Sequence, residues 1–231
     1  NAPERLPELR GLYPNMDIED YHSGPGVSNS GLNDFARSPA HYYALHLDPE
    51  RPPAHERAGQ LEGTLAHCAV LEPDEFDKRY VVVPEDAPNR PSVAQWRAKN
   101  PSAESKAAMA WWTDFNARTG GAKVITSAQR DVAMAQARSI RSNPDLAALL
   151  AKGMAEVSAF WHDEETGLLC RCRPDFVSTV SDDGVVLLDV KTYSDASPSE
   201  FARQVARMGY HRQDAFYTDG YAQAAHVNVL G

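Results

Sequence analysis

The chain has 231 residues, of which 42% are hydrophobic and 24% are charged, as expected for a globular protein with a substantial core. No apolar run approaches the roughly 20 residues that span a bilayer, and the N-terminus carries no signal-peptide pattern. The formal net charge of −9 argues against a protein that simply coats nucleic acid, although an enzyme needs only a local positive track. The three cysteines, Cys68, Cys170 and Cys172, are too few for a four-cysteine iron–sulfur cluster and fit a reduced, cytosolic setting.

The first 26 residues are rich in proline, glycine and charge, which predicts an irregular arm in front of a domain at residues 27–231. A first helix is expected after a Ser28 or Ser30 cap and before Pro39. Caps, prolines and apolar periodicity predict further helices at 40–46, 60–71, 103–117, 127–142, 145–151, 198–208 and 212–225. Short strands are expected at 80–83, 155–162 and 227–230, and a proline-rich loop at 84–101.

The most informative stretch is residues 168–192, LLCRCRPDFVSTVSDDGVVLLDVKT. Two runs of β-branched and apolar residues flank the turn sequence at 181–184, so this stretch predicts a β-hairpin. Because side chains alternate along a strand, Arg171, Arg173 and Asp175 are expected on one face of the first strand.

The second strand of this hairpin is expected to carry Asp189 and Lys191 on one face. Its other face is expected to lie in the core and carries Val186, Leu188 and Val190. Asp175 and Asp189 are nearly symmetric about the turn, so pairing brings their carboxylates together. Two carboxylates about 4 Å apart repel by roughly 4 kcal/mol at an effective dielectric near 20, a cost that a divalent cation reverses. The arrangement predicts a metal site with a lysine beside it.

An Asp-x-Lys pair alone is common, and on an exposed strand it is usually a solvated face. Here it follows residues 185–188, a continuously apolar run that indicates a buried strand. Charges at the end of such a strand are costly to bury without a partner, which favours a site over a solvated face.

Pro174-Asp175 followed by Asp189-Val190-Lys191 resembles the PD-(D/E)xK nuclease core in its Asp-x-Lys form. The segments CRCRPD, LLDVKT and YHRQDAFYTDGY resemble more closely the RecE-like (exonuclease VIII) nuclease family, within the RecB-like branch of that superfamily. The likeness extends upstream through GTLAHCAVLEP and MDIEDYHSGPGVSNSGLNDFARSPAHYYA. It covers nearly the whole chain and is weakest between about residues 84 and 122.

This resemblance implies an α/β fold of the restriction-endonuclease-like kind, a mixed central sheet flanked by helices, over residues 27–231. The family continues with at least one more sheet strand, so the chain is expected to be truncated at its C-terminus.

The resemblance also implies the members of a metal site. Asp175 and Asp189 are the expected acidic ligands, and the Val190 carbonyl is a further one. His67, in the GTLAHCAVLEP motif, is expected as a catalytic metal ligand four residues after a glycine on the same helix face. The expected cofactor is Mg²⁺, with Mn²⁺ as an alternative because of the imidazole, and one or two ions remain open. Lys191 either positions the attacking water or neutralises transition-state charge.

Several supporting residues are expected around that site. Glu156 is either an acid near the metal or a surface glutamate. Gln213 and Tyr217 project together from the last helix and match the RecB-like Gln-x-x-x-Tyr motif, whose role is DNA-backbone contact or support of the site; a core tyrosine with a capping glutamine is the alternative. Arg171 and Arg173 either hold phosphate or balance carboxylates.

The function that the resemblance implies is divalent-metal-dependent hydrolysis of DNA from duplex ends, 5′ to 3′, for recombination with a single-strand annealing partner. It also implies a ring-shaped homo-oligomer, tetrameric in the family, and a bacterial or prophage setting in the cytoplasm. Two alternatives stand beside it: a nucleic-acid-binding subunit that keeps the fold without cleaving, and a RecB-like endonuclease. Intact Asp175, Asp189 and Lys191 speak against the first.

Overall fold

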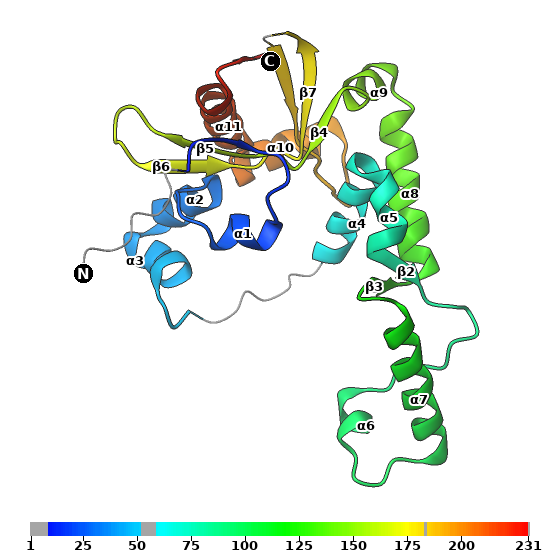
Figure 1. The fold of residues 1–231 in the computed structure, drawn as a ribbon. Helices are drawn as coiled ribbons and strands as arrows, with labels where there is room; N and C mark the ends of the chain where they lie inside the picture. Colours follow the sequence, from blue (N-terminus) through cyan, green and yellow to red (C-terminus); the bar gives the residue numbers. More distant parts are fainter. Residues whose placement is uncertain (1–8, 52–58, 183, 231) are drawn as a thin grey trace. The chain divides into compact units, whose positions relative to one another are not determined.

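The computed structural model of the protein describes residues 9–51, 59–182 and 184–230. The chain forms two compact units (Figure 1), one made of Asn1–Gln60 and Arg141–Gly231 and the other of Leu61–Ile140. That residues 27–231 form one nuclease domain stays a prediction. The fold class is mixed α/β with several sheets and flanking helices, as expected.

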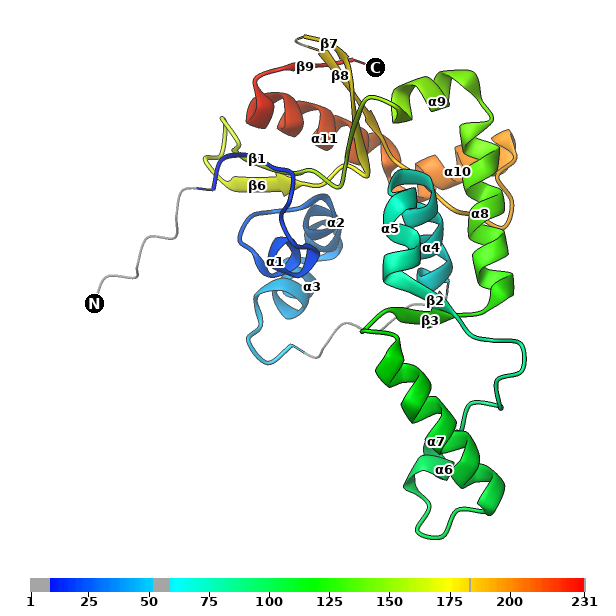
Figure 2. The same cartoon turned by 45° about the vertical axis from the view of Figure 1, so that its right-hand side comes forward.

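Two sheets form the centre of the first unit. One has the strand order β1–β5–β6 and the other β4–β7–β8–β9. Their bounds are β1 Gly11–Tyr13, β4 Gly153–Ala155, β5 Ser158–His162, β6 Leu169–Cys172, β7 Phe176–Ser181, β8 Gly184–Leu188 and β9 Asn228–Val229. The β8–β9 pair is parallel and the other pairs are antiparallel. Figure 2 shows β7, β8 and β9 side by side. The predicted β7–β8 hairpin is confirmed.

The two sheets meet where two neighbouring strands break at the same level. Ala159 pairs with Cys172 in the first sheet and Ala155 pairs with Phe176 in the second. These pairs belong to one unbroken register, which places Glu156 opposite Asp175. Glu156 has the left-handed φ of 56°, and the chain bends at Asp175. The single strands expected at 155–162 and from 168 to the turn are therefore each divided in two.

The core of the first unit lies between these sheets and α11 (Tyr210–Ala225). Its buried side chains are Val157, Ala159, Trp161, Cys170, Cys172, Val177, Val185, Tyr221 and Ala224. α11 approaches β5 closely because Gly220 faces the ring of Trp161, where a Cβ would lie 2.3 Å from the ring atoms.

The core face of β8 is the opposite of the predicted one. Val185 is buried and Leu187 packs beside it in the core, whereas the expected core residues Val186, Leu188 and Val190 are half-buried. α11 covers the face that carries Val185 and Leu187, and by strand alternation Asp189 belongs to that face. The acid thus lies at the end of the core layer.

The N-terminal residues contain regular structure, so the prediction of an irregular arm is wrong for the part that is described. β1 pairs with β5. α1 (Ile18–Ser23) begins at an Asp17 cap and buries Tyr21. The ring centroids of Tyr21 and Phe160 are 6.2 Å apart. Residues 1–8 of the expected arm lie outside the described residues.

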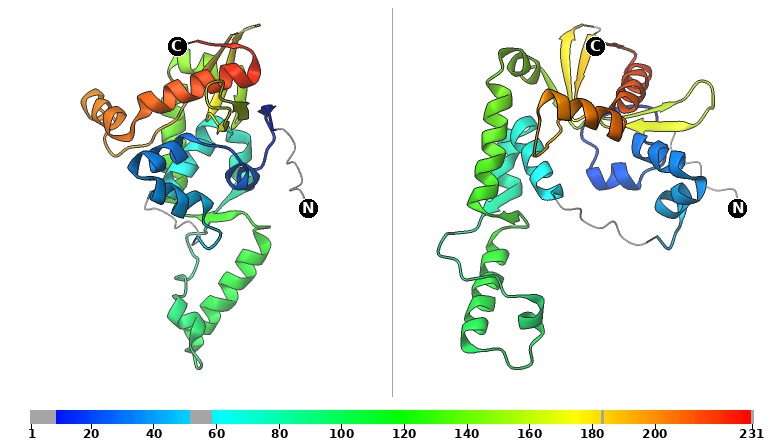
Figure 3. Two further views of the ribbon diagram at one scale, coloured as in Figure 1. Left: turned by 90° about the vertical axis from the view of Figure 1, so that its left-hand side faces the viewer. Right: turned by 180° about the vertical axis from the view of Figure 1, so that it is seen from behind.

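The remaining helices of the first unit largely match the sequence patterns. Ser28 caps α2 (Asn29–Arg37), which ends before Pro39, as predicted. Ser38 caps α3, which begins at Pro39, one residue before the predicted start. The other bounds are α3 Pro39–Tyr42, a π-helical stretch η1 at Tyr43–Leu47, α9 Pro144–Leu150 and α10 Pro198–Met208. α10 leads directly into α11 through Gly209, at a left-handed φ of 70° (Figure 3).

The second unit is mainly helical, with one parallel pair of strands. Its elements are α4 Gln60–Leu71, α5 Pro73–Arg79, β2 Tyr80–Val82, α6 Val93–Arg97, α7 Ala103–Arg118, β3 Lys123–Ile125 and α8 Ser127–Arg141. Leu65, Val70, Phe76 and Ile125 are fully buried in it. The expected loop at 84–101 contains α6. Within the described part of the chain, no helix combines the length and apolarity needed to cross a membrane.

Candidate functional site

Glu156 and Asp175 form the centre of the candidate site. The Glu156 N–H donates to the Asp175 backbone carbonyl at 3.0 Å, and one carboxylate oxygen of each residue lies within 4.8 Å of the other. Both residues lie where their neighbouring strands are interrupted, and there their two carboxylates lie close to each other. Sequence reasoning had left Glu156 open between a site acid and a surface residue; the structure brings it to Asp175.

Asp189 continues the same row of acids directly after the end of the neighbouring strand β8. Phe176 pairs with Leu188, and one further step of this register places Asp175 opposite Asp189. The Val190 N–H donates to Asp175 Oδ2 at 2.6 Å. The predicted approach of the two chain segments is therefore present.

The Asp189 carboxylate itself points to two other partners. Lys191 Nζ forms an ion pair with Asp189 Oδ2, and Gln213 Nε2 donates to Asp189 Oδ1 at 2.9 Å. Among the described residues, Asp189 is not part of the close carboxylate cluster of Glu156 and Asp175.

Two tyrosines support Lys191. Its Nζ lies 5.4 Å from the centroid of the Tyr210 ring, within the range of a cation–π interaction. The hydroxyls of Tyr210 and Tyr193 share a hydrogen bond. Burial, followed by this hydrogen bond, raises the pKa of Tyr193 to about 12. The ammonium is therefore held between a carboxylate and an aromatic face, an arrangement that strand spacing did not predict.

Gln213 and Tyr217 project together from α11, as their spacing predicted. Both line a hollow of 380 Å³ that Glu156 and Arg173 also line. Burial is the main cause that raises the pKa of Tyr217, so its phenol is a neutral hydrogen-bonding group. The helix thus brings one amide and one hydroxyl to the acids.

Arg173 has the second of its two predicted roles, balancing a carboxylate. Its Nε donates to Glu156 Oε2 at 2.8 Å. Its Nη1 donates to Ser158 Oγ at 2.6 Å and to the Met16 carbonyl at 2.9 Å. These bonds hold the guanidinium in place and hold the Glu156 carboxylate in turn.

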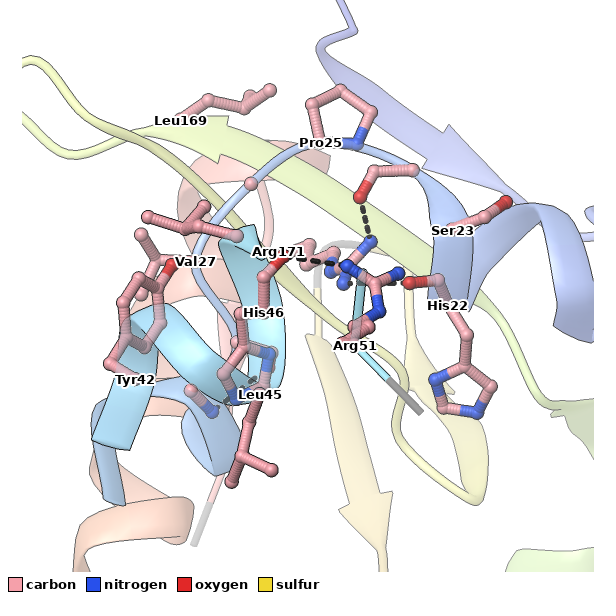
Figure 4. A pocket seen from close by; sticks show the side chains of 15 residues that line it. His22, Ser23, Pro25, Val27, Tyr42, Leu45, His46, Arg51, Leu169 and Arg171 are labelled. Atoms are coloured by element: carbon pink, nitrogen blue, oxygen red, sulfur yellow. Dashed lines mark hydrogen bonds between the residues drawn. The ribbon is translucent and has the colours of Figure 1, made fainter. Parts of the chain in front are cut away.

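Arg171 and Arg173 both lie over the Tyr21 ring and both line the hollow that Glu156, Gln213 and Tyr217 line, but the Arg171 guanidinium binds backbone carbonyls and no carboxylate among the described residues. The side chain is 8% exposed and lies in the hollow that His22, Tyr42 and Arg51 line (Figure 4). Its Nη1 donates to the carbonyls of Tyr21 and Gly24, and Nη2 to that of His22 at 3.3 Å. Burial lowers the pKa of Arg171.

These contacts show that Arg171 attaches the end of α1 to β6. The neighbouring Cys170 and Cys172 face the core, so Arg171 must face away from it. The strand break before Asp175 changes which alternate positions face α11, and this change is invisible in the spacing.

His67 lies on α4 in the second unit and is half-buried between buried neighbours. Its helix has the predicted bounds. Its role as a metal ligand stays a prediction.

The donor set of the first unit fits a divalent cation. Two carboxylates this close repel in the absence of a counter-charge, and carboxylate oxygens are the ligands that Mg²⁺ and Mn²⁺ accept. Arg173 offsets part of the charge from one side.

A mixed sheet that carries this acid row, an Asp-x-Lys end and a supporting Gln and Tyr defines a nuclease-type domain of the PD-(D/E)xK class, whose members commonly use divalent metals. The chain belongs to the family described as PDDEXK-like domain of unknown function (DUF3799), whose model matches residues 28–230. A search of curated proteins finds no match. The superfamily expected from the sequence is confirmed, whereas the RecE-like assignment stays a prediction.

Proposed function

We propose that this protein is a divalent-metal-dependent DNA exonuclease that hydrolyses phosphodiester bonds from duplex ends. The observation that supports this best is the row of Glu156, Asp175 and Asp189 at the adjoining ends of the neighbouring strands β4, β7 and β8, with Lys191 paired to the last of them. A protein that only bound DNA would gain nothing from the close carboxylates of Glu156 and Asp175 with a third acid at the end of the next strand, because each acid repels phosphate.

The acids are the metal ligands in this proposal. Glu156 and Asp175 hold the cation, Mg²⁺ or Mn²⁺, with Asp189 and the Val190 carbonyl beside them. His67 joins them by the resemblance of its motif. A bound divalent cation supplies Lewis-acid activation of water and of the scissile phosphate.

The other side chains position and neutralise. Lys191 turns its ammonium from Asp189 to the attacking water or to the charge that develops on the phosphate. Tyr217 donates a hydrogen bond to the DNA backbone from the same hollow, and Gln213 supports the site by its hydrogen bond to Asp189. Arg173 keeps the Glu156 carboxylate oriented.

The direction and setting of the reaction are carried by the resemblance to RecE-like nucleases. We propose 5′-to-3′ digestion that leaves a 3′ single strand for an annealing protein, in recombination of a bacterial or prophage genome. The same resemblance supports a homo-oligomeric ring around the DNA.

The decisive experiment is digestion of linear duplex DNA that carries distinguishable 5′ and 3′ labels, with Mg²⁺, with Mn²⁺ and with a chelator. We expect metal-dependent release of the 5′ label first, and loss of activity in Asp189→Asn. Asp182→Asn, the same change at an exposed hairpin acid, is the matched control.

Two results would overturn the proposal. Wild-type protein that leaves linear duplex uncut with either metal would favour the non-cleaving binding subunit. Covalently closed circles cut as readily as linear DNA would favour an endonuclease.

A further inference from the structure

The chain between β2 and β3 of the second unit, residues 83–122, forms a built substructure. Ser92 opens α6 with a complete capping box. Gln95 of α6 donates to Ser105 of α7 at 3.2 Å. Figures 1 and 2 both show α6 beside α7. The segment therefore presents its surface side chains from defined positions.

Only part of its aromatic content is needed for packing. Trp112 and Phe115 are buried, and the Trp112 indole N–H donates to the Pro88 carbonyl at 2.9 Å. Trp111 stacks on Phe115 with the ring centroids 4.9 Å apart, is half-buried, and lines an open hollow of 770 Å³. Trp96 of α6 is 46% exposed. It follows Gln95, whose side chain donates a hydrogen bond to Ser105 of α7. The Trp96 indole is thus exposed, and the Trp111 indole is partly accessible from the hollow.

The substructure at residues 83–122 has a net charge of +1, from Arg90, Arg97, Lys99, Lys106 and Arg118 against Glu85, Asp86, Glu104 and Asp114, and its cations are concentrated between residues 87 and 111. Residues 87–111 contain four cationic side chains, Arg90, Arg97, Lys99 and Lys106, and one acid, Glu104. That is a local charge of +3 (4 minus 1) in a chain of net charge −9. Within the described residues, Arg97, Lys99 and Lys106 have no carboxylate partner, and all three are exposed.

We infer that this surface, from Arg90 to Trp111, binds an unpaired DNA strand. Exposed indoles stack on bases, and unpaired cations neutralise the phosphates between them. A duplex hides its base faces by internal stacking, so the indoles favour the single strand. The polar lining of the hollow, which includes Asn89, Gln95 and Ser102, suits bases that also offer hydrogen-bonding edges. The inference rests on the proposed function only for the source of the strand, which is the one left by digestion.

The test is fluorescence anisotropy with the whole protein in chelator, so that no cleavage is needed. The probe is a labelled oligothymidylate of about 20 nucleotides, longer than the roughly 4–16 nucleotides of a typical single-strand site. We expect Trp96→Ala to weaken binding at least about fivefold. We expect Arg97→Glu with Lys99→Glu to lower the salt dependence of log K by at least about 1.4, the contribution of two phosphate contacts.

Matched controls separate this surface from general effects. Arg130→Glu with Arg138→Glu makes the same charge change on α8, and Tyr43→Ala removes an aromatic side chain that is 53% exposed elsewhere. Both are expected to bind as wild type does. Trp96→Phe keeps an aromatic face and is expected to restore most of the binding lost in Trp96→Ala.

Four results would overturn the inference. The first is wild-type protein that does not bind the oligonucleotide. The second is that the variants bind it as wild type does. The third is that Arg97→Glu with Lys99→Glu weakens the binding of blunt duplex and of single strand equally, while Trp96→Ala has no effect. Self-association through Trp96 without oligonucleotide binding would indicate a protein partner and equally refute it. Wild-type protein that binds the strand but cuts no DNA with metal would overturn the proposed function alone.

Discussion

Glu156 and Asp175 lie opposite each other at a break shared by two neighbouring strands, joined by a 3.0 Å backbone hydrogen bond. A left-handed backbone costs a non-glycine residue roughly 1–2 kcal/mol, and Glu156 adopts it at φ 56°. The Arg173 ion pair and the Asp175 carbonyl hold it there. The carboxylates of Glu156 and Asp175 are therefore brought together at a residue whose backbone conformation is strained.

Metal binding is expected to stabilise the folded protein through these acids. Mn²⁺ at 100 times its dissociation constant raises the free energy of unfolding by about 2.7 kcal/mol. Asp175→Asn keeps the shape of the side chain but removes the charge, so it should abolish the stabilisation; Asp182→Asn should not. Thermal unfolding with and without Mn²⁺ measures this. Equal metal effects in wild type and Asp175→Asn would exclude Asp175 as a ligand.

Gln213 is expected to act through Asp189, to which it donates a hydrogen bond. Gln213→Leu should lower the cleavage rate by about 10–100-fold, the usual effect of losing an outer-shell partner. Gln213→Glu should lower it further because it places a like charge beside Asp189. Gln204→Leu, which removes an amide bonded to Glu200, is the control in the same end-label assay. Rates within twofold of wild type for Gln213→Leu would contradict this role.

Arg171 is expected to contribute to stability more than its single charge suggests. It satisfies three backbone carbonyls at the end of α1, and each buried group left unsatisfied costs about 1–3 kcal/mol. Arg171→Leu should therefore lower the free energy of unfolding by about 3 kcal/mol or more in urea denaturation, and Arg171→Lys should restore only part of it. Arg203→Leu, at an exposed ion pair, should change it by less than about 1 kcal/mol.

Gly220 is expected to be sensitive to the smallest addition. A Cβ there would lie 2.3 Å from the Trp161 ring, and Trp161 is 3% exposed and unable to move aside. Gly220→Ala should destabilise the protein by about 1–3 kcal/mol, despite alanine's higher helix propensity. Asp219→Ala, one position earlier and exposed, should change stability by no more than about 0.5 kcal/mol. A stabilised Gly220→Ala variant would contradict the close packing of α11 on β5.

Alkaline pH is expected to unfold the protein in part through Tyr221. Burial raises its pKa from the ordinary 10.0 to about 12, so the unfolded chain releases this proton first. The stabilisation is complete below pH 10 and is lost as pH rises to about 12, a change of roughly 2–3 kcal/mol. Tyr221→Phe should have a shallower fall in urea stability over this range. Tyr43→Phe, at an exposed tyrosine, should follow wild type.

Much of the local structure was predictable because it depends on neighbours in the chain. α4 begins and ends at the predicted residues, and Ser28 and Ser197-Pro198 mark the expected helix starts. The spacing of Gln213 and Tyr217 determines that their side chains lie together on a helix. The β7–β8 hairpin follows from its turn sequence.

The site required contacts between distant segments. Nothing in the sequence around Arg171 indicates that its strand ends at Cys172, because the break lies where Asp175 meets Glu156, a residue of an earlier segment of the chain. Arg171 donates to carbonyls at the end of α1, whereas Arg173 donates to Glu156, and the spacing of the two arginines does not distinguish these partners. Gly209 changes the direction of the chain between α10 and α11. Tyr210, the first residue of α11, lies there with its ring beside the Lys191 ammonium.

The amino-acid sequence by itself determined the class of fold, the helix ends and the identity of the acids and the lysine, because these depend on periodicity, capping and residue chemistry within a few positions. Only the tertiary structure decided which acid lies beside which, and which arginine serves the site. Strand register and the side of the sheet that a helix covers are set by packing across the molecule. A shift of one residue in strand register moves every side chain of that strand to the other face of the sheet.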